Sequence, residues 1–190
     1  MKKTSVIVFA AMVVMLSGCV KKPDVPVEYS GFHCVGSWNE YDNAFEISLY
    51  PFDMDSETYK TGTAEVKWLW SSDGKSFEQY SETSSYAEKL MIVPDERFEV
   101  NLENDPYDRK LSQKIIRAEV KGEDGIVHIA APLRIMWDTE YHNGFATLYD
   151  SDEDGLVDVL ECQDENYDPF NPDSDGDGIS DYNEWYDFSE

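Results

Sequence analysis

The chain has 190 residues and a formal net charge of −25, from 15 Lys and Arg against 40 Asp and Glu. This charge argues against a nucleic-acid backbone as the partner, because phosphate binding needs a basic surface. Hydrophobic residues make up 41% and aromatic residues 14% of the chain, which is too apolar for a wholly disordered protein. Of the 40 acidic residues, 16 lie within residues 150–190, which contain no Lys or Arg. We therefore expect one folded domain followed by a small acidic module.

The N-terminus carries the features of a secretion signal. Two lysines precede an apolar run over residues 6–16, and its 11 residues are fewer than the roughly 20 that span a membrane. The adjoining Leu16-Ser17-Gly18-Cys19 resembles the lipobox of prokaryotic lipoproteins. The resemblance implies removal of residues 1–18 and lipidation of Cys19, with residues 19–36 as the lipidated N-terminus and tether. An ordinary signal peptide with an incidental cysteine is the alternative.

Cysteine usage suggests one disulfide. Apart from Cys19, the chain contains only Cys34 and Cys162, and export favours oxidation of such a pair. The bond would close a loop of more than 100 residues. In chain-entropy models such a bond stabilises the folded state by about 4–5 kcal/mol. It would also tie the acidic module to the folded domain. Two buried free thiols are the alternative.

Residues 37–139 alternate between apolar and polar side chains with a period of two, which is typical of strands with one buried face. The clearest segments centre on Ile47, Trp68, Val100 and Ala118, and turn-forming residues separate them. About seven strands over about 100 residues predict a mainly β fold, an antiparallel sandwich. The domain resembles an immunoglobulin-like β-sandwich in strand number and spacing, although the Cys…Trp…Cys signature is absent. A jelly roll or a small barrel is the alternative.

A few side chains of this domain invite a functional interpretation. Trp68 and Trp70 share one strand face, and we expect them in the core. The alternative is a platform for a glycan, with Trp38 as another candidate. Asp53 and Asp55 could bind a cation, but a solvated loop is the preferred interpretation.

Motifs for catalysis are absent from the sequence. None of the three histidines, His33, His128 and His142, lies in a recognisable nucleophile motif, and no glycine-rich phosphate loop is present. The abundant carboxylates leave a glycosidase-type pair open. We expect a protein that is not an enzyme, with a hydrolase as the alternative.

Two segments of the acidic module, residues 140–190, match the 12-residue calcium-loop pattern. In both, Asp occupies positions 1, 3, 5 and 9, Gly occupies position 6, and Glu occupies position 12. The predicted ligands, including the carbonyl group of position 7, are Asp150, Asp152, Asp154, Leu156, Asp158 and Glu161 in loop 1 (residues 150–161), and Asp173, Asp175, Asp177, Ile179, Asp181 and Glu184 in loop 2 (residues 173–184). Such hard oxygen ligands suit Ca²⁺, so we expect two calcium ions. A solvated acidic run, the alternative, would not require the Gly and the final Glu.

The sequence around the loops argues against helix-loop-helix EF-hands, because residues 140–145 make a poor helix and Pro169 limits the exit of loop 1 to a short turn. Residues 150–184 resemble thrombospondin type 3 repeats of exported microbial proteins. That resemblance implies calcium-dependent structure and no catalysis. Small residues are common at position 4 in that family, where loop 1 has Glu153, and we expect this difference to matter little because position 4 points away from the ion.

Charge repulsion predicts how the module depends on metal. Its acidic groups repel one another and few apolar residues offset the ordering entropy, so we expect disorder without metal and folding with it. The whole sequence then predicts an exported lipoprotein, periplasmic or at the cell surface, held through Cys19 in the cell membrane or outer membrane. A structural or adhesive role at the cell envelope is the preferred function. A surface protein that binds a glycan or peptide partner through the β domain is the alternative.

Overall fold

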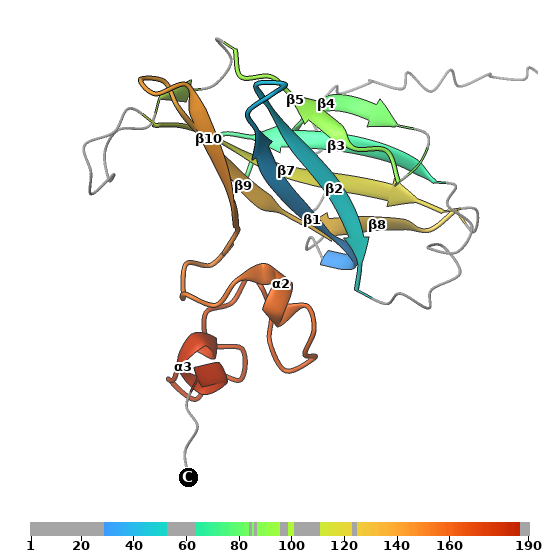
Figure 1. Ribbon diagram of the computed structural model, residues 1–190. Helices are drawn as coiled ribbons and strands as arrows, with labels where there is room; N and C mark the ends of the chain where they lie inside the picture. The colour runs from blue at the N-terminus through green and yellow to red at the C-terminus, as the bar shows by residue number, and fades with distance from the viewer. Residues whose placement is uncertain are drawn as a thin grey trace, which may run out of the picture.

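The computed structural model describes residues 29–52, 64–83, 85, 87–95, 99–100, 111–122 and 125–186. These residues form a β domain followed by a small module with two short helices (Figure 1). The strands are β1 (Tyr29–Asn39), β2 (Ala44–Pro51), β3 (Glu65–Ser71), β4 (Glu78–Thr83), β5 (Leu90–Ile92), β6 (Glu99–Val100), β7 (Leu111–Lys121), β8 (Val127–Ala131), β9 (Leu133–Asp138) and β10 (Asn143–Leu148). The helices are α2 (Asp158–Glu161) and α3 (Asp181–Tyr186). No helix among the described residues is long and apolar enough to cross a membrane.

All ten strands belong to one hydrogen-bonded sheet, with the long strand β7 at its centre. One edge of β7 pairs with β6 and β3, and β4 continues beyond β3. The other edge pairs with β9 and β8 in succession. β9 also pairs with β10. β8 pairs in parallel with β1, which pairs with β2, and β2 pairs with β5.

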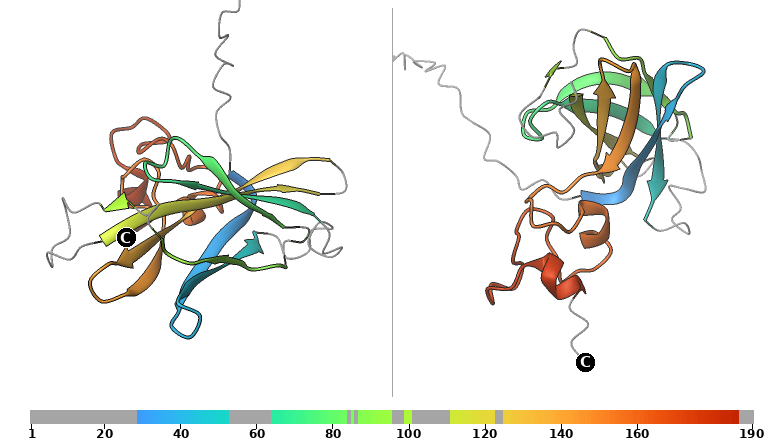
Figure 2. Two further views of the ribbon diagram at one scale, coloured as in Figure 1. Left: turned by 90° about the horizontal axis from the view of Figure 1, so that it is seen from above. Right: turned by 60° about the vertical axis from the view of Figure 1, so that its left-hand side comes forward.

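The sheet curls until it is nearly closed and barrel-like (Figure 2). The predicted mainly β character is confirmed, but the predicted immunoglobulin-like sandwich is not. A sandwich needs two separate facing sheets, whereas β7 carries partners along both edges and joins all the strands into one sheet.

The core follows the period-two pattern of the sequence. Ile47, Val66, Trp68 and Val120 are at most 1% exposed, and they share one hydrophobic cluster with residues from β1, β5 and β9. Trp70 belongs to the same cluster. The prediction that Trp68 and Trp70 lie in the core is therefore confirmed, and neither ring is available as a platform for a sugar.

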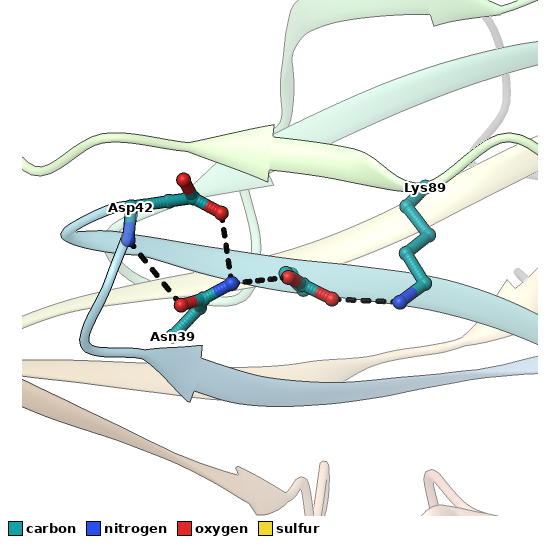
Figure 3. A network of polar contacts seen from close by, with 4 residues as sticks. Asn39, Asp42 and Lys89 are labelled. Atoms are coloured by element: carbon teal, nitrogen blue, oxygen red, sulfur yellow. Dashed lines mark hydrogen bonds and ion pairs between the residues drawn. The ribbon is translucent and has the colours of Figure 1, made fainter.

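A polar network holds the turn between β1 and β2 (Figure 3). The side-chain oxygen of Asn39 accepts the backbone N–H groups of Tyr41, at 2.9 Å, and Asp42, at 3.3 Å. Its amide nitrogen donates to carboxylate oxygens of Asp42, at 2.9 Å, and Glu46, at 2.5 Å. Glu46 also forms an ion pair with Lys89, with an N···O distance of 2.7 Å. The network therefore ties this hairpin to the segment that leads into β5.

The hairpin of β9 and β10 packs beside the hairpin of β1 and β2. The ring centroids of Trp38 and Trp137 lie 4.8 Å apart. A Cβ atom at Gly144 would lie 2.3 Å from the ring of Phe45, so only glycine fits at this crossing. β10 therefore lies beside β1 and β2 at the place where the sheet nearly closes.

The boundaries of the folded domain differ from those expected. β1 includes residues 29–36 of the expected tether, and β10 includes residues 143–148 of the expected acidic module. Phe32 and Cys34 are both buried in β1, which explains why this segment joins the sheet. The β domain thus spans residues 29–148, in place of 37–139.

The predicted disulfide between Cys34 and Cys162 is not formed, and both cysteines are free. Cys34 points into the hydrophobic cluster of the β domain, with no exposed surface. Cys162 is half-buried in the module, directly after α2. The two thiols therefore belong to different parts of the molecule. Both are free, but of the expected two buried thiols only Cys34 is fully buried.

The module lies against the end of the β domain at which β1 begins. The hydroxyl groups of Tyr29 and Ser151 are 3.2 Å apart, and the ring of Tyr29 lies 4.9 Å from that of Phe170. The guanidinium group of Arg134 lies 5.0 Å from the ring centroid of Tyr149, the residue that precedes loop 1. These contacts place loop 1 next to the sheet and loop 2 farther from it (Figure 1).

Candidate metal centre

Loop 1 is folded around its first aspartate. One carboxylate oxygen of Asp150 accepts the N–H group of Glu153, at 2.7 Å, and the other accepts that of Gly155, at 2.9 Å. Gly155 has a φ of +106°, a conformation that an L side chain would strain. As a result Asp150, Asp152 and Asp154 each offer a carboxylate oxygen within 4.8 Å of the others. Three such oxygens can hold one metal ion.

The exit turn of loop 1 contributes two further carboxylates, both fully buried. Asp158 accepts hydrogen bonds from the backbone N–H, at 2.7 Å, and the hydroxyl group, at 2.8 Å, of Ser151. Glu161 is 0% exposed, and neither of its carboxylate oxygens has a hydrogen-bond partner. One carboxylate oxygen of Asp152 is also buried without a partner. Burial of an unpartnered carboxylate is costly, and these oxygens are available to a positively charged ligand.

Electrostatics support this interpretation of loop 1. Burial, together with the charges of Asp152, Asp158 and Asp154, raises the pKa of Glu161 to about 9. Burial likewise raises the pKa of Asp158 to about 7 and that of Asp152 to about 6. Without a cation the folded loop therefore holds protons that an exposed acid would have lost. A divalent ion would replace those protons.

Loop 2 repeats this architecture 23 residues later. The carboxylate oxygens of Asp173 accept the N–H groups of Gly176 and Gly178, both at 2.9 Å. Asp181, like Asp158, is buried and accepts hydrogen bonds from the N–H and the hydroxyl group of a serine, here Ser174. The oxygens of Asp173, Asp175 and Asp177 again lie within 4.8 Å of one another. Two loops with the same internal bonds are thus built from the same spacing.

The position-7 residues mark the main difference between the loops. Their backbone N–H groups both donate to the position-5 aspartate, Leu156 to Asp154 at 2.7 Å and Ile179 to Asp177 at 2.8 Å. The Leu156 side chain is 1% exposed, whereas Ile179 is 46% exposed. Loop 2 is therefore the more solvated of the two, and its final Glu184 is only half-buried.

Position 4 has a backbone role that the sequence pattern did not reveal. Glu153 has a φ of +65°, and its counterpart Gly176 has a φ of +76°. Both residues occupy the left-handed region, which costs an L residue roughly 1–2 kcal/mol. Gly176 avoids this cost because it has no Cβ atom, whereas Glu153 does not. The expectation that Glu153 matters little considered only the side chain.

Other candidate groups lie outside this centre. Within the described residues, the groups that could hold a metal ion contain only aspartates. Burial raises the pKa of the Cys162 thiol to about 12, so at neutral pH it is not a thiolate ligand. His128 lies on β8, as a strand histidine, and His33 lies on β1. Cys19 and the pair Asp53 and Asp55 lie outside the described residues.

Comparison of the chain with family models, curated proteins and solved structures gives no match.

Proposed function

We propose that the C-terminal module binds two calcium ions, one in each loop, and that the protein is an exported lipoprotein with a structural or adhesive role at the cell envelope. The observation that carries the calcium proposal is Glu161, which is fully buried with two carboxylate oxygens that lack partners. It stands at position 12 of loop 1, where a calcium loop places its bidentate ligand.

The chemistry of the ligands favours calcium over other metals. Every predicted side-chain ligand in both loops is a carboxylate, and soft ligands are absent from the two Asp groups. Hard oxygen ligands suit Ca²⁺ and disfavour zinc and copper. Six or seven oxygens from a flexible loop also suit the larger Ca²⁺ better than Mg²⁺, which demands a near-octahedral set.

The ions would act as structural clamps. Extracellular calcium modules bind with dissociation constants of about 10⁻⁴–10⁻³ M, so millimolar calcium outside the cell would keep the loops filled. Loop 1 begins directly after Tyr149, and its Ser151 contacts Tyr29 at the start of β1. An ion in loop 1 would therefore also fix the module against the β domain.

The membrane anchor is proposed from the lipobox residues Leu16–Cys19. Several acyl chains on Cys19 would hold the protein at a membrane, since each buried CH₂ group contributes about 0.8 kcal/mol. The test is detergent-phase partitioning of the protein from a bacterial host, with Cys19→Ser as the variant. Cys19→Ser should move the protein to the aqueous phase, and unchanged partitioning would contradict the anchor.

The calcium proposal is tested by titration and by native mass spectrometry of the full chain. We expect two bound ions at millimolar calcium, one in Glu161→Gln and one in Glu184→Gln. Glu165→Gln is the matched control, because the substitution removes the same charge at an exposed residue that lies between the loops. Binding of two ions should persist in this control. Absence of bound metal in the unmodified protein at millimolar calcium would refute the proposal.

A further inference from the structure

The two loops meet at Asp154, the position-5 carboxylate of loop 1. One oxygen of Asp154 accepts the N–H group of Leu156 within its own loop, at 2.7 Å. The other oxygen accepts the N–H group of Tyr182, at 2.7 Å. Tyr182 is the second residue of α3, the helix that begins at position 9 of loop 2. A single carboxylate thus belongs to loop 1 and also satisfies a backbone donor of loop 2.

The corresponding aspartate of loop 2 has no such second role. Asp177 accepts the N–H group of Ile179, at 2.8 Å, through one oxygen. Its other oxygen has no bond of this kind to another loop among the described residues. The link therefore runs only from the carboxylate of loop 1 to the helix of loop 2.

Two further contacts join the loops at the same place. The ring of Tyr182 lies against Gly155, where an added Cβ would stand 3.1 Å from the ring. The Asp181 carboxylate lies close enough to Glu161 for the two charges to repel each other. Each loop therefore affects the other both through backbone geometry and through charge.

Loop 2 depends on this junction more than loop 1 does. Loop 1 is attached to the β domain through Ser151 and Tyr29, and its Leu156 is buried. In α3 only Asp181 is buried. The first turn of α3 carries both Asp181 and Glu184, so the link at Tyr182 positions the segment that supplies both late ligands of loop 2.

We propose that the two calcium sites fill cooperatively, loop 1 first, through the shared carboxylate of Asp154. This inference rests on the proposed function. An ion in loop 1 fixes the orientation of the Asp154 carboxylate. The oxygen that accepts the N–H group of Tyr182 then orders the first turn of α3. By linkage, an ion in loop 2 strengthens binding in loop 1 by the same factor.

The test follows each loop separately in the full chain. The backbone amides of Gly155 and Gly178 donate to the first aspartate of their own loops, so their nitrogen-15 NMR signals report the filling of loop 1 and loop 2. In the unmodified protein the Gly155 signal should respond at lower calcium than the Gly178 signal. Glu161→Gln should raise the calcium concentration at which the Gly178 signal is half-shifted by about tenfold. Glu184→Gln should raise the corresponding concentration for the Gly155 signal by the same factor. Glu165→Gln should change either response by less than about twofold, because an exposed charge is screened by salt.

A pair of substitutions at Tyr182 isolates the hydrogen bond. Tyr182→Pro removes the N–H group in the first helical turn, where that group has no acceptor within the helix. Tyr182→Ala removes the ring and keeps the N–H group. We expect the proline variant to bind two ions independently and the alanine variant to keep the order of filling. Equal behaviour of the two variants would overturn the role of Asp154.

The outcomes separate the inference from the function on which it rests. Two saturable but independent responses of Gly155 and Gly178 in the unmodified protein would overturn cooperativity and leave calcium binding intact. No saturable response in either loop would overturn both. Should Tyr182→Pro lose α3 altogether, the reciprocity of Glu161→Gln and Glu184→Gln still decides the question, because those variants leave Tyr182 unchanged.

Discussion

Position 4 of loop 1 offers a sharp test of how the backbone limits calcium binding. Glu153 has a φ of +65°, whereas loop 2 places Gly176 at the same position. We predict that Glu153→Gly tightens calcium binding to loop 1. The substitution removes the cost of holding an L residue in the left-handed conformation, roughly 1–2 kcal/mol. It also destabilises the folded loop by about 0.4–1 kcal/mol, because glycine has more conformational freedom in the unfolded chain.

From the midpoints of the two ranges, the remainder is about 0.8 kcal/mol, which corresponds to a factor of about four in affinity if folding of the loop accompanies binding. Glu153→Ala is the control, because it removes the same charge and keeps the Cβ atom. Glu153 is exposed, so neither variant removes a packed side chain. Calorimetric titration of both variants measures the difference. Equal affinities for the glycine and alanine variants would refute the strain at this position.

Four further predictions concern the buried carboxylates, the packing of Gly144 and the two cysteines. Calcium affinity should fall as the pH drops from about 9 to 6, because Glu161, whose pKa burial raises to about 9, must lose its proton to bind. The same raised pKa makes the metal-free module most stable below about pH 4.5 and less stable as the pH rises toward 9. Denaturation in chelator at a series of pH values measures this stability. A free energy of unfolding that does not change with pH would contradict the prediction. Gly144→Ala should destabilise the β domain by about 1–3 kcal/mol through overlap with the Phe45 ring, and Phe45→Leu should recover part of the melting temperature; an unchanged melt of Gly144→Ala would disprove the close packing. Cys34 and Cys162 should both be alkylated in denaturant without reductant, and a protected pair in the mass spectrum would show a disulfide instead.

The loops could be predicted from the sequence because their ligands are local. The spacing of Asp150, Asp152 and Asp154 within a few residues, with Gly155 behind them, determines the curl of the loop without help from the rest of the fold. The sequence pattern does not contain φ, however, so the strained position of Glu153 became visible only in the structure. The link between Asp154 and Tyr182 spans 28 residues and has no signature in either loop.

The fold was less accessible because strand pairing is not local. Alternation identified β2, β3 and β7 through residues such as Ile47 and Val120, but it does not say which edges meet. The parallel pairing of β1 with β8 is a case of this kind. β1 itself was missed because Gly31 and Gly36 interrupt its apolar pattern, and β10 was missed because none of its residues is fully buried. The even number of cysteines was misleading, since composition says nothing of where Cys34 lies.

The adjacency of Tyr29 and Ser151 has a mechanical consequence. The polypeptide enters and leaves the β domain at one end, so a pull between the N-terminus and the C-terminal module loads this contact before it loads the sheet. The hydroxyl pair and the ring of Phe170 against Tyr29 would separate first. The strands would bear force only afterwards, so the interface between the β domain and the module would separate first under tension.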